Sequence, residues 1–174
     1  MKTVVINEND WEDLREIRLA SLKESPEAFC LSYQEAISYT SEDWKLRASE
    51  KEGPRFLITY KDTAPIGIIG GVFANEEYEL IAMWVTPECR SSGVGVQLVE
   101  ALKDHASSLG HTNIMLRVSL GNEAACRLYA KCGFSVVGKA GALVSDDNIK
   151  LHKMVWQQLP SLNKKLQSTA VSSA

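Results

Sequence analysis

The sequence predicts a mixed α/β fold in which a largely antiparallel central sheet is flanked by helices. Apolar runs of strand length recur from residue 56 onwards, and the first three follow one another across short turns. Stretches with apolar residues at helical spacing precede and follow these runs. The 174 residues suffice for one domain with a sizeable core, which we expect to span residues 1–159. Residues 160–174 are small and polar, which predicts a mobile tail.

The composition excludes several classes of function. Hydrophobic residues make up 45% of the chain and charged residues 24%, as in ordinary globular proteins. A net charge of -3 argues against a dedicated nucleic-acid-binding protein, which usually carries a strong basic excess. No apolar run is long enough to cross a bilayer, and the N-terminus lacks a signal-peptide core, so we predict a cytoplasmic protein without membrane association. The four cysteines and three histidines show no metal-binding spacing, so no metal site is predicted.

The first third of the chain alternates one strand with helices. Residues 3–6 read as a strand, and Asp10 is a candidate cap for a helix over residues 11–23. Residues 29–37 are ambiguous and favour a short helix. Thr40 or Ser41 then caps a further helix, which Gly53-Pro54 should end.

Three antiparallel strands are predicted next. Residues 56–60 and 66–74 form a hairpin around the turn at residues 61–65. Glycines 67, 70 and 71 in its second strand indicate a bulge or a close backbone approach. The third strand is the apolar run at residues 80–85, which Thr86-Pro87 stops.

The stretch after this strand has the properties of an anion-binding turn. Residues 90–95 are mostly small, and a helix with an apolar face begins at Val94 and should end near Gly110. The first N–H groups of a helix lack intrahelical partners, and the helix dipole is positive there. Gly93 and Gly95 would let a phosphate approach the backbone, and Arg90 adds a positive charge. The alternative is an ordinary strand-to-helix turn that uses glycine for its geometry.

Two other phosphate-binding folds fit this turn less well. A P-loop needs Gly-Lys-Ser/Thr, and here Val96 follows Gly95. A dinucleotide-binding fingerprint needs a third glycine, and Leu98 occupies its position. Both readings are therefore disfavoured.

The C-terminal third contains another strand–helix pair and two final strands. Residues 114–118 read as a strand, and Asn122 can cap a helix from Glu123 to about Lys131 that Gly133 ends. Strands are predicted at residues 134–137 and 149–156, with a loop at residues 138–148 between them.

Two sequence blocks resemble the signatures of one family. They are Val85-x-Pro87-x-x-Arg90-x-x-Gly93-x-Gly95 and Asn122-Glu-Ala-Ala-Cys-Arg-Leu-Tyr129-Ala-Lys-Cys-Gly133-Phe134. Together they are similar to the acyl-CoA-binding signatures of the GNAT N-acetyltransferase superfamily, over roughly residues 56–156. The resemblance implies a GNAT-like fold whose fourth and fifth strands splay apart, with the pantetheine arm of acetyl-CoA between them and its diphosphate on the turn at residues 90–95.

The resemblance also implies roles for individual residues. Tyr129 corresponds to the family's donor to the thioester sulfur, and Glu79 to a glutamate that acts as base in related histone acetyltransferases. Tyr129 could instead be a packing residue, and Glu79 a solvated acid in a site whose base is ordered water. The expected contacts to acetyl-CoA or coenzyme A come from Met83, Trp84, Val85, Arg90, Ser91, Ser92, Gly93, Val94, Gly95, Val96, Asn122, Ala125 and Tyr129.

The segment after the first strand is expected to recognise the acceptor. In the family this segment covers the acceptor site, and its candidate residues here are Arg18, Phe29, Tyr33, Glu35 and Trp44. The predicted function is transfer of an acetyl group from acetyl-CoA to a primary amine of a small molecule or peptide, by direct attack in a ternary complex. A non-catalytic acyl-CoA-binding or sensing module is the alternative from another class. Dimers are common in the family, so a homodimer is expected.

Overall fold

The fold is a mixed sheet with helices on both faces, as the sequence predicts. A computed structural model describes residues 1–49, 53–143 and 146–158, and within them seven strands form one sheet in the order β1-β2-β3-β4-β5-β7-β6. Only the pairing of β4 with β5 is parallel among these neighbours. The strands are β1 (Lys2–Val5), β2 (Arg55–Lys61), β3 (Ala64–Ala74), β4 (Glu77–Val85), β5 (Asn113–Ser119), β6 (Ser135–Leu143) and β7 (Asp146–Gln157).

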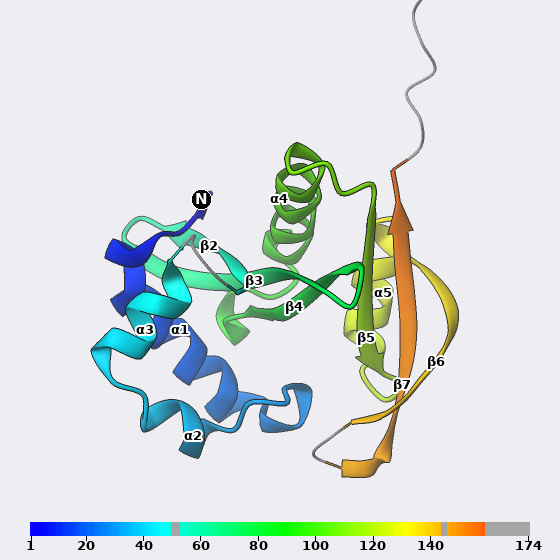
Figure 1. Ribbon diagram of the computed structural model, residues 1–174, viewed down its shortest axis with the longest axis horizontal. Coiled ribbons are helices and arrows are strands. Elements are labelled where there is room, and N and C mark those ends of the chain that lie inside the picture. Colours follow the sequence, from blue (N-terminus) through cyan, green and yellow to red (C-terminus); the bar gives the residue numbers. More distant parts are fainter. Residues whose placement is uncertain (50–52, 144–145, 159–174) are drawn as a thin grey trace, which may run out of the picture.

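The helices divide between the two faces of the sheet. Helices α1 to α3 cover one face, and α4 and α5 cover the other (Figure 1). Within the described ranges, no helix has the length and apolar composition needed to span a membrane. The α-helices are α1 (Trp11–Glu24), α2 (Tyr33–Ile37), α3 (Ser41–Ala48), α4 (Val94–Ser108) and α5 (Glu123–Lys131), and the 3-10 turns are η1 (Glu8–Asp10), η2 (Pro26–Ala28) and η3 (Pro87–Cys89).

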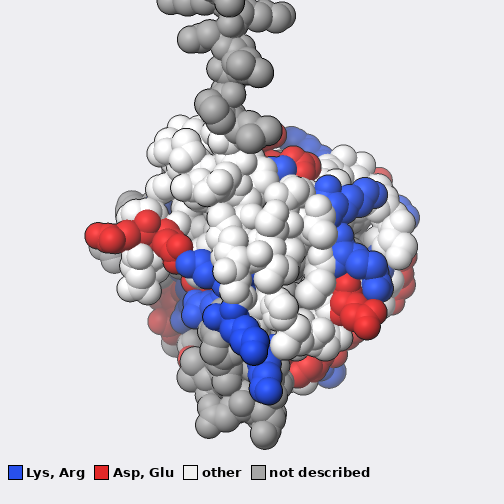
Figure 2. Space-filling view, turned by 90° about the vertical axis from the view of Figure 1, so that its right-hand side faces the viewer, with Lys and Arg blue, Asp and Glu red and all other residues white. Residues whose placement is uncertain are grey.

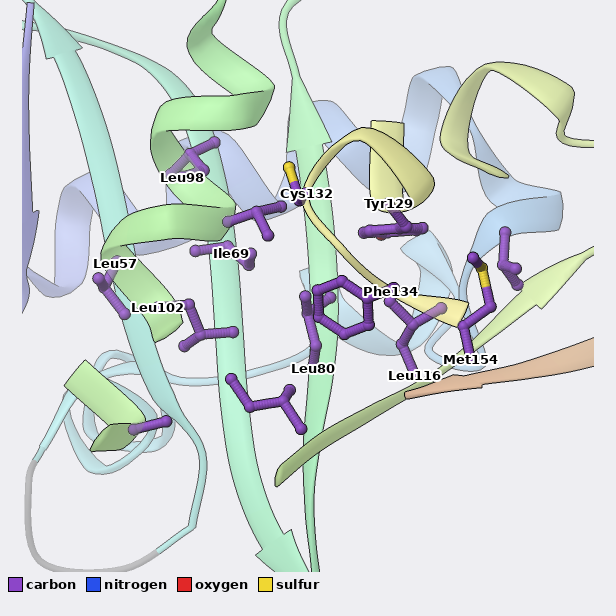
Figure 3. Packing of buried hydrophobic residues seen from close by; sticks show 14 of the residues in the cluster. Leu57, Ile69, Leu80, Leu98, Leu102, Leu116, Tyr129, Cys132, Phe134 and Met154 are labelled. Atoms are coloured by element: carbon purple, nitrogen blue, oxygen red, sulfur yellow. The ribbon is translucent and has the colours of Figure 1, made fainter. Parts of the chain in front are cut away.

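Alternating side chains of the central strands form two separate cores. Leu57 of β2 packs in the core under α4 and α5, while its neighbour Ile58 packs in the core under α1 to α3. Ile69 and Ile68 of β3 divide in the same way. This follows from the two-residue period of a strand. Figure 3 shows Leu57 and Ile69 beside Leu98 and Leu102 of α4.

The glycines of β3 lie against side chains of neighbouring elements. A Cβ atom on Gly71 would lie 2.2 Å from the Tyr78 hydroxyl oxygen, and one on Gly67 would lie 2.9 Å from Leu98 Cδ1. The β3–β4 register also shifts between Ile68 and Gly70, which marks a bulge. The predicted bulge is therefore confirmed, whereas the closest contacts at Gly67 and Gly71 come from side chains and not from another backbone.

Strands β4 and β5 splay apart, as the family resemblance implies. Their described pairing consists of one position, Glu79 opposite Met115. Beyond it, Ala82 of β4 has a φ of 56°, and the register with β3 passes from Ile81 directly to Trp84. Ala82 and Met83 therefore lie outside the β3 ladder, on the part of β4 where β5 has already diverged.

Local sequence signals locate most helix ends. Asn122 Oδ1 accepts a hydrogen bond from the Ala125 amide (3.0 Å), and Gly133 has a φ of 84°, as predicted for the two ends of α5. Asp10 occupies the predicted N-cap position of α1, but its side chain makes no capping hydrogen bond there. Asp10 also ends the 3-10 turn η1, which Asn7 caps. The predicted stop at Gly53 is also late, because α3 ends at Ala48.

The predicted loop at residues 138–148 is wrong. Strand β6 continues to Leu143, and β7 already begins at Asp146. The register of this pair shifts three times. Backbone pairing at the edge of a sheet requires little of the side chains, so small and acidic residues gave no strand signal. The predicted tail at residues 160–174 lies outside the described residues.

The sheet ends at β6 with exposed apolar side chains. Val136 and Val137 are 56% and 59% exposed. Figure 2 looks onto the side of the molecule that carries β6 and β7, and a broad area without charged side chains occupies its centre.

Candidate active site

One pocket of about 690 Å³ passes through the gap between β4 and β5. On the side of the N-terminal helices it is lined by four of the predicted acceptor residues, Arg18, Phe29, Glu35 and Trp44. The fifth, Tyr33, packs against the core under α1 to α3 and does not line the pocket.

The other end of the same pocket contains predicted cofactor residues. Met83, Asn122, Ala125 and Tyr129 line it, and Glu79 lies between the two ends. The structure thus brings together residues from β4, α5 and the N-terminal segment that are far apart in the sequence. Trp84 and Val85 do not line this pocket: Trp84 packs under α1, and Val85 packs under α4.

The predicted anion-binding turn leads directly into α4. Ser91 and Gly93 have φ values of 62° and 93°, and Gly93 is the N-cap of the helix. Gln97 donates the first intrahelical hydrogen bond, to Gly93 O (3.0 Å). The amides of Val94, Gly95 and Val96 precede that bond, and the first turn of α4 contains no acidic side chain. An anion of suitable shape would therefore meet free donors and the positive end of a 15-residue helix.

Three other residues of this turn have structural roles of their own. Ser92 Oγ donates to Cys89 O (2.6 Å), which closes the turn. The Val94 side chain is buried in the core under α4. A Cβ atom on Gly95 would lie 3.1 Å from Leu128 Cδ2 and 3.3 Å from Met83 Cε, so close packing of α4 on α5 already favours glycine there. A close phosphate approach at Gly95 stays a prediction.

Arg90 is held by a partner that the sequence did not indicate. Its Nη2 donates to Glu24 Oε2 (2.8 Å), and its Nε donates to Val85 O (3.0 Å). Glu24 also accepts from Trp84 Nε1 (2.9 Å) and from the Ser25 hydroxyl. These hydrogen bonds lower the pKa of Glu24 to about 2. The bond from Arg90 has the largest effect, and those from Ser25 and Trp84 have smaller ones. Glu24 thus ties the end of α1 to the turn before α4, across 66 residues of sequence.

Glu79 forms a bidentate ion pair with Arg117 of β5. Arg117 Nη2 lies 2.7 Å from Oε1 and 2.8 Å from Oε2, and Arg117 Nε lies 2.9 Å from Oε1. The Glu79 side chain is 16% exposed, and both residues line the pocket. Sequence reasoning did not identify Arg117 as a site residue. The available signal was its position in the predicted strand, because a residue between the buried Leu116 and Val118 faces outward. The ion pair fixes the carboxylate at the point where β4 and β5 separate.

Tyr129 has a buried ring and an uncommitted hydroxyl group. It is 6% exposed and lies 5.8 Å from the Phe134 ring between centroids (Figure 3). Burial, with smaller contributions from Cys132 and Cys126, raises its pKa above the ordinary value. The hydroxyl makes no hydrogen bond to any residue that the structure describes. It therefore remains protonated at neutral pH and free to donate to a group in the pocket.

The acceptor end contains further residues that sequence reasoning missed. Tyr39 and Arg47 also line the pocket, and the Tyr39 and Trp44 rings meet edge to face at 5.6 Å. Arg47 follows Trp44 by three residues on α3, and this spacing places both side chains on one face of the helix. From this spacing, Arg47 could have been predicted to lie beside Trp44 in the site. Among the described residues, no three His, Cys, Asp or Glu side chains cluster as a metal site would require.

Several solved structures share this fold. A GNAT-family acetyltransferase from Streptococcus pneumoniae superimposes with a TM-score of 0.74 at 20% identity, over 90% of this chain and 98% of its own. A putative acetyltransferase from Salmonella typhimurium, solved with its cofactor acetyl-CoA, gives 0.76 at 16% identity over 95% and 98%. An N-acetyltransferase from Thermoplasma acidophilum, in complex with coenzyme A, gives 0.67 at 21% identity over 90% and 99%. At these identities the likeness establishes the fold.

Comparison of sequences finds a relative that matches a short segment of the chain and a family model that matches most of it. The probable N-acetyltransferase 14 of Xenopus tropicalis is 38% identical over 64 residues, which are 37% of this chain. The match spans about a third, 31%, of that relative's length. The model of the acetyltransferase (GNAT) family matches residues 11–134, most of the chain. The chain belongs to the acetyltransferase (GNAT) family.

Proposed function

We propose that this protein transfers an acetyl group from acetyl-CoA to a primary amine by direct attack in a ternary complex. The observation that carries the proposal is the single pocket that runs from the aromatic acceptor end, past Glu79, to the free hydroxyl of Tyr129. Relatives of the same fold contain acetyl-CoA or coenzyme A. A pocket open toward both β4 and α5 lets the amine and the thioester meet without a covalent enzyme intermediate.

The cofactor would be held mainly by backbone groups. The amides of Val94, Gly95 and Val96 would bind the diphosphate, with Ser91, Ser92 and Gly93 shaping the turn and Arg90 at its edge. Met83 lies outside the β3 ladder where β5 has diverged, so the backbone of residues 83–85 is placed to pair with the pantetheine arm. Asn122 Oδ1 caps α5, which leaves its amide NH₂ group as a donor toward the pocket.

The reaction needs a neutral amine. An amine with a pKa near 10.4 is unprotonated in only about one molecule in a few thousand at pH 7. Glu79, oriented by Arg117, would accept its proton directly or through a water molecule. The amine nitrogen then bonds to the acyl carbon, and the carbon–sulfur bond breaks as the tetrahedral state collapses. Backbone N–H groups near Met83 would stabilise the oxyanion, and Tyr129 would donate a hydrogen bond to the departing sulfur.

The experiment is thiol release from acetyl-CoA with a panel of amines and small peptides. We expect Tyr129→Phe to lower kcat about 10- to 100-fold, the worth of one hydrogen bond to a charged atom. The dissociation constant of Tyr129→Phe for coenzyme A should stay within about twofold of the wild-type value, because the lost hydrogen bond acts in the transition state and not in cofactor binding. Tyr78→Phe is the matched control, since its buried hydroxyl lies outside the pocket. Equal loss in both variants would contradict the role of Tyr129.

One observation favours the alternative of a non-catalytic acyl-CoA-binding or sensing module. Arg117 donates to both oxygens of Glu79, so the candidate base is already engaged. A sensing module would bind coenzyme A as tightly but release no thiol with any amine. Glu79→Gln separates the two: it lowers kcat in an enzyme that uses this base and changes nothing measurable in a sensing module.

We further propose that residues 1–159 form the whole domain, that residues 160–174 are dispensable for folding, and that the protein is cytoplasmic. The free thiols at the four cysteines suit a reducing compartment. The exposed valines of edge strand β6 favour a homodimer. A chain truncated after residue 159 should unfold at the same temperature as the full chain. Light scattering on the full chain should give the mass of a dimer.

A further inference from the structure

The end of the pocket beside the N-terminal helices contains a buried cation that has no counterion among the described residues. Arg18 of α1 is 7% exposed and lines the pocket. Its Nη1 donates one long hydrogen bond to Ser21 Oγ (3.3 Å), and its guanidinium lies 4.9 Å from the centroid of the Phe29 ring. No described carboxylate forms an ion pair with it. Buried charges in folded proteins are normally paired or bound to a ligand, so this guanidinium needs explaining.

A second arginine lies in the same part of the pocket. The Arg47 guanidinium lies 4.1 Å from the centroid of the Tyr39 ring, and it too forms no ion pair with a described residue. The pKa of Arg18 is lowered to about 10. Burial is the largest cause, and repulsion from Arg47 is the second. Two like charges are thus held near each other by aromatic rings, which is unfavourable unless an anion joins them.

The acidic residues nearby form no ion pair with either arginine, although hydrogen bonds from Thr40 and, to a smaller extent, the charge of Arg47 lower the pKa of Asp43. Glu35 is exposed and accepts a hydrogen bond from the Tyr39 hydroxyl (2.9 Å). Asp43 is held by Thr40 in the capping box of α3, and Glu79 is held by Arg117. Glu27 lines the pocket but is an exposed residue. In addition, the buried Trp44 Nε1 has no hydrogen-bond partner among the described residues.

We propose that the pocket selects amines that also carry an anionic oxyacid group, a carboxylate or a phosphate, and that Arg18 and Arg47 bind this group together. The planar guanidinium fork matches both oxyacids. The anion would then lie at the acceptor end, and the amine would extend toward Glu79 in the gap between β4 and β5. This inference rests on the proposed acetyl transfer, and it names the chemical class of the acceptor.

The test uses matched pairs of amines. Glycylglycine is compared with glycylglycinamide, and phosphoethanolamine with ethanolamine, each in the thiol-release assay with acetyl-CoA. We expect at least one anionic member to exceed its neutral partner about 10- to 100-fold in kcat/KM, the range of a charge-assisted hydrogen bond. The pair that shows the larger ratio identifies carboxylate or phosphate as the preferred group. Equal rates within each pair, or faster neutral amines, would overturn the inference while leaving the acetyltransferase proposal intact.

Variants connect the preference to the two arginines. Arg47→Gln and Arg18→Gln should each remove most of the ratio by lowering kcat/KM for the anionic member of the pair. Arg15→Gln, on the exposed side of α1 and outside this pocket, is the matched control and should keep the ratio. Arg47 is only partly buried, so its variant decides the question even if Arg18→Gln fails to fold. A ratio that survives Arg47→Gln contradicts the proposal.

A binding measurement separates failure of the inference from failure of the proposed function. Calorimetric titration of glycylglycine and phosphoethanolamine into the protein saturated with coenzyme A needs no turnover. Binding of an anionic amine that weakens about tenfold or more in Arg47→Gln supports the inference, even if no acetyl transfer occurs and the protein proves to be a sensor. If neither compound binds and neither is acetylated, the inference is wrong.

Discussion

Replacing Glu24 by glutamine should remove the contact that joins α1 to the turn before α4. The Glu24 carboxylate accepts hydrogen bonds from Arg90 (2.8 Å) and Trp84 (2.9 Å). Glutamine keeps the size of the side chain but loses its charge. The change therefore tests the electrostatic part of the contact and creates no cavity.

The size of the effect follows from the exposure of the two partners. A pKa of about 2 for Glu24, against an ordinary value near 4.3, corresponds to about 3 kcal/mol without screening. The Glu24 and Arg90 side chains are 37% and 45% exposed, so solvent screens most of that value. The indole of Trp84 is much less exposed and retains its share. We expect Glu24→Gln to lower the free energy of unfolding by about 1–2 kcal/mol at pH 7.

The dependence on pH has a definite sign. A carboxyl group whose folded pKa lies below its unfolded pKa stabilises the protein above the unfolded value, and this contribution is lost as the pH falls toward the folded value. For Glu24 the loss should run from about pH 4.3 down to about pH 2. The difference between wild type and Glu24→Gln should therefore be full at pH 7 and shrink through this window.

Urea unfolding at several pH values between 7 and 3, followed by tryptophan fluorescence, measures this difference. Glu16→Gln is the matched control, because Glu16 lies on the exposed face of α1 and forms no ion pair with a described residue. The assigned role of Glu24 would be refuted if the loss of unfolding free energy in Glu24→Gln stayed constant with pH. It would also be refuted if Glu16→Gln lost as much unfolding free energy as Glu24→Gln.

Two further changes test packing and capping. Gly71→Ala should cost about 3 kcal/mol in thermal or urea unfolding, because its Cβ atom would lie 2.2 Å from the buried Tyr78 hydroxyl oxygen. Adding Tyr78→Phe to this variant should restore only part of the lost stability, because the ring atom Cζ would still lie 2.6 Å from the new Cβ atom. If Gly71→Ala alone left the stability unchanged, the packing described here would be contradicted. Asn122→Ala should cost about 1 kcal/mol through loss of the cap, whereas Asn122→Asp should keep the stability but weaken coenzyme A binding through added negative charge. Equal destabilisation by both Asn122 variants would contradict the capping role.

The sequence predicts the parts of this fold that local chemistry determines. The helix after Gly93, the capped helix after Asn122 and the crowded glycines of β3 all follow from residue types at short spacing. The extension of β6 to Leu143 does not, because a sheet edge is held by backbone pairing with β7 that leaves no pattern in the side chains.

The candidate site divides in the same way. Tyr129 and the turn before α4 lie in continuous sequence blocks, and the resemblance to the family located them. The partners of Arg90 and Glu79 could not be found in this way, because Glu24 and Arg117 lie 66 and 38 residues away and reach them only through the tertiary fold. Arg18 was recognisable as a candidate acceptor residue, but only the structure shows that it is buried and that no described carboxylate pairs with it.

The central claim is that the amides at the start of α4 hold a diphosphate and so direct a thioester toward Tyr129. A crystal structure with bound acetyl-CoA tests this most directly. The account predicts diphosphate oxygens about 3 Å from the amide nitrogens of Gly95 or Val96, and a thioester sulfur within about 4 Å of the Tyr129 hydroxyl oxygen. A diphosphate bound away from this turn, or a sulfur that Tyr129 cannot reach, would contradict it.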